Sequence, residues 1–113
     1  MLVPVRPLSD LSPGDAVRVE SDGAGHSGPA VAVFCTDHGL FAVDDSCTHQ
    51  DAALSDGWLE GCWIECPLHA ALFDLRTGEP DGFPADGPVR THAVVVVDGV
   101  VHVELPEDRR AAA

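Results

Sequence analysis

Two short cysteine-histidine motifs constrain this chain more than any other feature of its sequence. The first is Cys47-x-His49 and the second is Cys66-x-x-His69, with residues 50–65 between them. Together they offer two thiolates and two imidazoles, which is a complete ligand set for a metal centre. We therefore expect the two motifs to lie close together in the folded chain and the other residues to form a scaffold around them.

The order of the ligands favours iron over zinc. Each motif carries one cysteine and one histidine, whereas zinc fingers and ribbons usually pair Cys with Cys and His with His. Mixed pairs suit a two-iron centre in which one iron takes both cysteines and the other takes both histidines, because neutral imidazoles remove negative charge from a cluster. A structural zinc site remains an alternative, and so do two disulfides, for which the four cysteines would suffice.

Charge and hydropathy limit the partners. The formal charge is -13, from 19 acidic and 6 basic residues, which disfavours nucleic acid and anionic membrane surfaces as partners. A basic protein partner is compatible with this charge, whereas for most of the individual carboxylates solubility is the simpler role. No stretch approaches the roughly 20 apolar residues of a membrane span. The N-terminal segment Met1–Pro7 has no basic region ahead of an apolar run, so we expect a cytoplasmic protein.

The chain reads as a single all-β domain, residues 1–113. Nine prolines and eleven glycines favour many short strands, and Asp98-Gly99 predicts a type I′ hairpin turn. The run Val94–Val97 predicts a strand covered on both faces, and residues 51–56 predict a single helical turn. The strands are expected near residues 2–6, 15–20, 30–36, 40–43, 62–65, 71–75, 91–97 and 100–105.

The ligand pattern resembles the Rieske 2Fe-2S proteins. Four further segments look like the soluble Rieske ferredoxins of bacterial ring-hydroxylating dioxygenases: Leu8–Gly14, Gly57-Trp58, Phe73-Asp74 and Arg76–Glu79. The resemblance implies a Rieske fold of antiparallel sheets with a small cluster-binding subdomain at about residues 45–75. It also implies one Rieske 2Fe-2S cluster per chain, with these metal ligands: Cys47, His49, Cys66 and His69.

The same resemblance implies electron transfer and no catalysis by the chain itself. A flavin-dependent NAD(P)H reductase would reduce the cluster, and a terminal Rieske non-haem iron oxygenase would accept the electron. No small-molecule substrate and no catalytic residue are expected, since no 2-His-1-carboxylate set is evident beyond the cluster ligands. The alternatives are a small Rieske-fold subunit of an assimilatory nitrite reductase, a structural zinc-binding module and a redox-sensing interaction module.

Departures from the respiratory Rieske proteins predict a low reduction potential. Those proteins carry an extra cysteine in each loop, and a serine and a tyrosine that hydrogen-bond to the cluster or its ligands. Here the corresponding places of the second loop hold Leu68, Ala71 and Phe73, and the chain contains no tyrosine. Hydrogen bonds to cluster sulfur stabilise the more negative reduced state, so we expect a potential of about -150 mV, near the low end of the Rieske range.

Several other residues could bear on function. We expect Cys35 and Cys62 to be free thiols on strands, Cys35 being buried, and we favour core packing for Trp58 and Trp63 over a role in docking or in shielding the cluster. The remaining histidines are expected at turns, in solvent or on hydrogen-bond partners, and not on the metal: His26, His38, His92 and His102. A set of carboxylates near the motifs could steer a basic partner: Asp44, Asp45, Asp51, Asp56, Glu60, Glu65 and Asp74.

Overall fold

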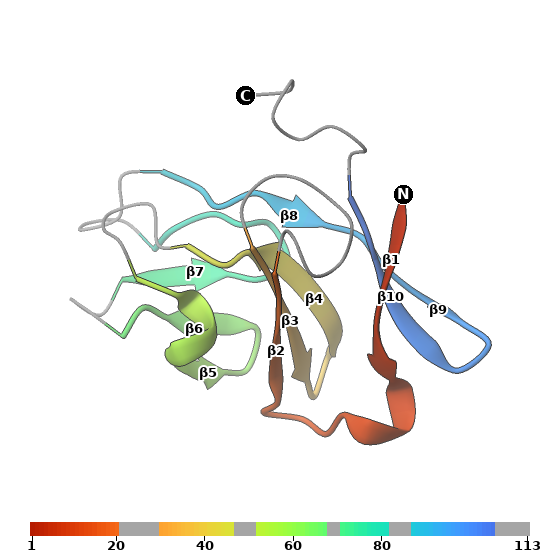
Figure 1. Ribbon diagram of the computed structural model, residues 1–113. Helices are drawn as coiled ribbons and strands as arrows, with labels where there is room; N and C mark the ends of the chain where they lie inside the picture. The colour runs from red at the N-terminus through yellow and green to blue at the C-terminus, as the bar shows by residue number, and fades with distance from the viewer. Residues whose placement is uncertain (21–29, 47–51, 68–70, 82–86, 106–113) are drawn as a thin grey trace.

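The computed structural model describes residues 1–20, 30–46, 52–67, 71–81 and 87–105. Within these ranges the chain forms short strands in three antiparallel sheets and two single-turn 3-10 helices, η1 (Leu8–Asp10) and η2 (Leu54–Asp56) (Figure 1). The described part contains no α-helix, and so no helix that is long and apolar enough to span a membrane. The all-β prediction is therefore confirmed, and the helical turn expected within residues 51–56 corresponds to η2.

The central sheet is built around a strand that is buried on both faces. Its order is β2 (Ala16–Val19), β3 (Val31–Thr36), β4 (Gly39–Asp44) and β8 (Thr91–His92). Along β3, the side chains of Val31 and Val33 enter one apolar cluster and those of Ala32 and Phe34 enter another, all at most 1% exposed. Alternate residues of a strand point to opposite faces, so β3 joins two cores.

The second sheet covers one face of β3. It consists of β1 (Leu2–Pro7), β10 (Val100–Glu104) and β9 (Val94–Val97), in that order. Val3, Val101 and Val103 are fully buried in the same cluster as Val31 and Val33. This sheet therefore closes the apolar core that lies away from the predicted metal motifs.

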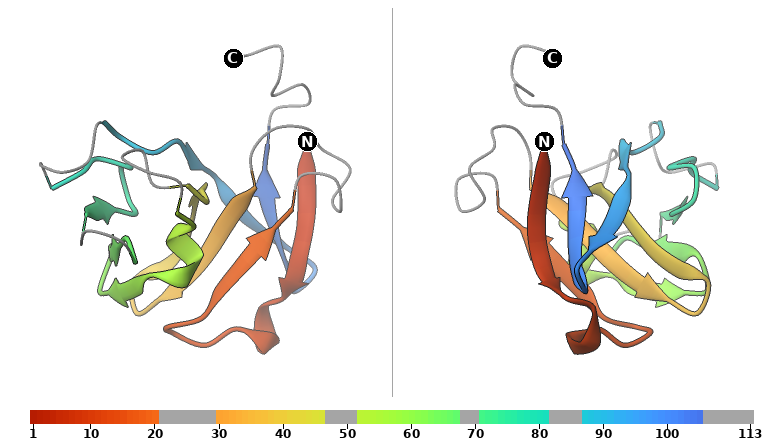
Figure 2. Two further views of the ribbon diagram at one scale, coloured as in Figure 1. Left: turned by 60° about the vertical axis from the view of Figure 1, so that its left-hand side comes forward. Right: turned by 90° about the vertical axis from the view of Figure 1, so that its right-hand side faces the viewer.

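The third sheet covers the other side. It is formed by β5 (Trp58–Glu60), β6 (Trp63–Glu65) and β7 (Leu72–Asp74), which lie between β4 and β8 in the chain. Ile64 and Phe73 point inward and are at most 1% exposed, in the same cluster as Ala32 and Phe34. Figures 1 and 2 show the central sheet lying between the other two.

The final hairpin confirms the turn prediction and corrects the burial prediction. Asp98 and Gly99 have φ angles of 51° and 79°, as a type I′ turn requires, and Val97 pairs with Val100 across it. The prediction that Val94–Val97 is covered on both faces is wrong, because Val95 to Val97 are 39–43% exposed. The strand lies at the edge of a three-stranded sheet, and its position there depends on long-range pairing that a run of valines does not specify.

Two further boundaries differ from the prediction. The expected strand over residues 91–97 is divided at Ala93, so that its first part pairs with β4 and its second with β10. The short strand β5 was not predicted. Its three residues are too few to display an alternating pattern, and it is stabilised as a strand by its antiparallel pairing with β6.

Close backbone contact at Gly78 gives a testable consequence. Gly78 has a φ of +82°, and a Cβ there would lie 2.1 Å from the carbonyl oxygen of Val89. Gly61 has a φ of +59° but open space around the same position, so it is a matched control for backbone strain. We expect Gly78→Ala to cost about 1–3 kcal/mol more than Gly61→Ala, which is a melting temperature lower by about 5 °C or more. Equal melting temperatures for the two variants would show that this contact does not constrain the fold.

Candidate metal centre

The structure describes one of the four predicted ligands. Cys66 follows β6 and is described, whereas Cys47, His49 and His69 lie outside the described residues. Among the residues that the structure does describe, no group of three or more His, Cys, Asp or Glu side chains could hold a metal ion. The structure therefore informs on the site through Cys66 and through the segments that flank both motifs.

Cys66 is held at the end of the β6–β7 pair. Its backbone N–H donates a hydrogen bond to the carbonyl oxygen of Ala71 at 2.7 Å, which continues the antiparallel pairing beyond β6. The side chain is fully buried, in the apolar cluster that contains Ile64 and Phe73. The second motif thus begins at a buried and hydrogen-bonded position of the scaffold.

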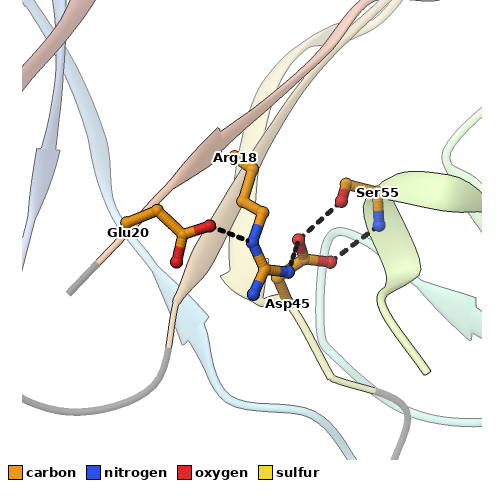
Figure 3. Close-up of polar contacts among 4 residues, drawn as sticks. All are labelled: Arg18, Glu20, Asp45 and Ser55. Atoms are coloured by element: carbon orange, nitrogen blue, oxygen red, sulfur yellow. Dashed lines mark hydrogen bonds and ion pairs between the residues drawn. The ribbon is translucent and has the colours of Figure 1, made fainter. Parts of the chain in front are cut away.

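A buried carboxylate links the two chain segments that lie before and after the first motif. Asp45 follows β4, and its carboxylate accepts a hydrogen bond from the backbone N–H of Ser55 at 2.7 Å and another from Ser55 Oγ at 2.5 Å (Figure 3). The Asp45 side chain is 0% exposed. Ser55 belongs to η2, so the carboxylate joins the end of β4 to the first element after the motif.

Arg18 of β2 supplies the positive charge that this carboxylate faces. Its Nη1 donates to Asp45 Oδ2 at 2.8 Å, and its Nε donates to Glu20 Oε1 at 2.5 Å (Figure 3). The hydrogen bond to Glu20, together with the weaker influence of Asp45, raises the pKa of Arg18. A buried carboxylate is costly unless it is both paired and hydrogen-bonded, and Asp45 meets both conditions.

The segments that flank the two motifs pack against each other. Gly57 directly follows η2, and its N–H donates to the carbonyl oxygen of Leu54 at 2.9 Å. A Cβ at Gly57 would lie 1.9 Å from the carbonyl oxygen of Glu65, the residue before Cys66. Only glycine permits this approach, which places the chain after the first motif directly against the start of the second.

These observations fit the predicted cluster. Cys66 is withdrawn from water in an apolar cluster, and the segments around both motifs are fixed to one another by backbone contact and by Asp45. Two thiolates and two imidazoles are the donor set of a Rieske centre. An apolar surrounding limits solvent access to such a centre, and hydrogen-bonded flanking segments help to orient its ligands.

A tight turn after β7 supports the same sheet. Asp74 accepts hydrogen bonds from the N–H, Nε and Nη2 groups of Arg76, at 2.8 to 2.9 Å. The side-chain hydrogen bond from Arg76 lowers the pKa of Asp74, and the backbone bond and the nearby positive charge act in the same direction. The turn continues to Gly78, whose N–H donates to the Asp74 carbonyl oxygen at 2.6 Å.

Most of the other histidines and cysteines lie in described segments, whereas His26 lies outside them. His92 Nε2 lies 2.7 Å from Asp44 Oδ1 and its side chain is 3% exposed, which agrees with the expected hydrogen-bond partner. Cys35 and Cys62 are free thiols, as expected. Cys35 is half-buried, less than expected, and burial raises the pKa of its thiol. Cys62 is buried in the β5–β6 turn, where a strand residue was expected.

Two sequence interpretations need correction. Trp58 is 61% exposed, so core packing is wrong for this residue, while Trp63 is half-buried on the same outer face of β5 and β6. Asp45 was grouped with surface carboxylates, although its side chain is fully buried. Its partner Arg18 is 27 positions away, and no local pattern in the sequence marks such a pair.

The Asp74–Arg76 contact predicts how stability depends on pH. A carboxylate whose pKa is lowered on folding adds stability above its unfolded value of about 3.9, and this stability is lost as pH falls through the folded value. We expect Arg76→Gln to melt below the wild type at pH 6, with the difference shrinking below about pH 4. The exposed Arg90 makes no ion pair within the described residues, so Arg90→Gln is the control. A wild-type advantage that is unchanged at pH 3 would contradict this account.

Comparison with known proteins identifies the family. The model of the Rieske [2Fe-2S] domain matches residues 1–93. The 3-phenylpropionate/cinnamic acid dioxygenase ferredoxin subunit of Photorhabdus laumondii is 41% identical over 103 residues, covering 90% of this chain and 92% of the relative.

Solved structures agree. The ferredoxin of Sphingomonas yanoikuyae B1 has a TM-score of 0.83 and 34% identity, covering 94% of this chain and 100% of that one. A chain from the complex of reduced oxygenase and oxidized ferredoxin in carbazole 1,9a-dioxygenase has a TM-score of 0.82 and 35% identity. The match covers 90% of this chain and 100% of that one. A putative nitrite reductase small subunit is more distant, with a TM-score of 0.71 and 25% identity, covering 93% and 99%. This chain belongs to the Rieske [2Fe-2S] domain family.

Proposed function

We propose that this protein is a Rieske ferredoxin that carries single electrons from an NAD(P)H-dependent flavoprotein reductase to the terminal oxygenase of a ring-hydroxylating dioxygenase system. The observation that carries this proposal is the 41% identity to a dioxygenase ferredoxin subunit across nearly the full length of both chains. The role is electron transfer, and the oxygenase performs the chemistry on the substrate. Identity to the nitrite reductase small subunit is lower, at 25%, which favours the dioxygenase system.

We infer that one cluster per chain is held by Cys47, His49, Cys66 and His69, within a subdomain of about residues 45–75. The buried position of Cys66 and the packing of the flanking segments support this assignment. When bound, the cluster accepts one electron and releases it to the next carrier. The protein's own residues supply the ligands, exclude water and fix the loop ends.

A cytoplasmic location follows from the proposed electron source. NAD(P)H is a cytoplasmic reductant, and the reductase and the ferredoxin must meet repeatedly. The proposed compartment therefore rests on the identity of the reductase.

The outer face of the β5–β6–β7 sheet has the character of a docking surface. Trp58 lies opposite Glu65 and Glu60 lies opposite Trp63, so indole rings and carboxylates alternate across the strands. A shallow cavity of about 280 Å³ beside them is lined by Glu60, Trp63, Leu72 and Asp81. An exposed tryptophan within an acidic rim suits a partner with basic groups around an apolar centre.

Docking on this face predicts an effect of both salt and Trp58. We expect Trp58→Ala to slow electron delivery to the oxygenase about tenfold, which corresponds to about 1.4 kcal/mol of lost contact. Rising ionic strength should slow delivery by both proteins, because it screens the attraction between acidic and basic surfaces. Stopped-flow oxidation of the reduced ferredoxin measures both effects.

The matched control is Val96→Ala, which removes a 43% exposed apolar side chain from β9 in another sheet. This variant should transfer electrons at the wild-type rate. A Trp58→Ala rate equal to that of Val96→Ala, or rates independent of salt, would count against this docking face.

The ligand assignment predicts a change in reduction potential. If the cluster survives in His69→Cys, the added thiolate charge should lower the potential, because it disfavours the more negative reduced state. The control is His38→Cys, at an exposed position in the β3–β4 turn, which should leave the potential unchanged. Spectroelectrochemical titration measures both, and a rise in potential for His69→Cys would contradict the assignment.

The proposed function is tested by reconstitution. NADH, the reductase and the oxygenase of a 3-phenylpropionate/cinnamic acid dioxygenase system would be combined with or without this protein. Hydroxylated product that appears only when the protein is present would support the proposal. A reduced protein that passes no electron to any dioxygenase component, but forms a stoichiometric complex with a sirohaem protein, would favour the nitrite reductase role.

A further inference from the structure

Asp45 combines features that no other carboxylate in the described ranges shares. Its side chain is 0% exposed, and its two oxygens accept two hydrogen bonds from Ser55 and one from Arg18. A carboxylate so enclosed cannot meet a substrate or a protein partner. Loss of a partner would leave the buried Asp45 charge poorly compensated, so each contact is expected to matter to the segments that it joins.

Those segments flank the proposed ligand motifs. Asp45 lies two residues before Cys47, and chain geometry alone keeps the two Cα atoms within about 7 Å of each other. Ser55 lies two residues before Gly57, whose backbone abuts the carbonyl oxygen of Glu65. A continuous series of contacts therefore begins at Asp45, just before the first motif. It runs through Ser55 and Gly57 to Glu65, just before the second motif.

Arg18 extends these contacts to the surface. Its side chain is 42% exposed and also meets Glu20, which is 57% exposed (Figure 3). A fixed negative charge close to a cluster disfavours the added electron, and a nearby positive charge favours it. Arg18 and Asp45 should therefore have opposite effects on the reduction potential while having the same effect on the rigidity of the loop ends.

We propose that Asp45 is a positioning residue for the cluster and that Arg18 balances its charge, so that this ion pair governs both cluster retention and reduction potential. The inference rests on the proposed cluster and adds two residues outside the ligand set. The polar contacts in Figure 3 would then tune the reduction potential of the cluster as well as stabilise the fold.

The test uses the purified full-length protein and three variants of the network. Asp45→Asn should raise the reduction potential and Arg18→Gln should lower it, while both shorten the half-life of the visible absorbance in the presence of a chelator by about tenfold. Ser55→Ala removes one hydrogen bond without a change in charge, so it should shorten the half-life by a smaller factor with the potential nearly unchanged. A purely structural role would not produce shifts of opposite sign.

The matched control for charge is Asp56→Asn. Asp56 neighbours Ser55 in η2 but is exposed, so water screens its charge, and its replacement should leave the half-life unchanged and shift the potential less than Asp45→Asn. If Asp45→Asn does not fold, the potential and half-life of Arg18→Gln test the inference. Arg18 is 42% exposed, so its replacement is expected to disturb the fold less.

Two results would overturn the inference while leaving the proposed function intact: an Arg18→Gln protein with wild-type potential and half-life, or equal shifts for Asp45→Asn and Asp56→Asn. A wild-type protein that binds no iron-sulfur cluster would instead overturn the proposed function, and this inference with it. That outcome is seen in the wild type alone, so the two failures are distinguishable.

Discussion

Burial of β3 on both faces is the constraint on which the rest of this structure depends. Its alternate side chains enter two separate apolar clusters, one closed by the β1–β10–β9 sheet and the other by the β5–β6–β7 sheet. The first cluster contains none of the predicted metal ligands, so it stabilises the fold independently of the proposed site. The second contains Cys66 together with Leu54, so the same packing that completes the fold also holds a proposed ligand and the element after the first motif.

The polar contacts of the site are built on this apolar frame. β2 and β4 flank β3, and they bring Arg18 and Asp45 together at one end of the central sheet. The Asp45 carboxylate accepts hydrogen bonds from Ser55 of η2. Gly57, directly after η2, allows the backbone to approach the carbonyl oxygen of Glu65. The segments that flank both motifs are therefore attached to one frame, which suits a carrier that alternates between two redox states.

The sequence predicted the features that depend on local chemistry. The Asp98-Gly99 turn was predicted because its two residues themselves favour positive φ angles, and the fold class followed from the resemblance around the four proposed ligands. The exposure of Val95 to Val97 was not predictable, because edge and central strands differ in their neighbours and not in their residues. The roles of Asp45 and Arg18 depend on a contact across 27 positions, which only the folded topology reveals.

The central claim is that this chain carries a Rieske 2Fe-2S cluster that accepts one electron. The most direct measurement is an EPR spectrum of the anaerobically purified protein before and after dithionite, with iron and acid-labile sulfide counted on the same sample. The account predicts about two irons and two sulfides per chain and a rhombic Rieske signal that appears only on reduction. A colourless, EPR-silent protein that carries zinc would contradict it.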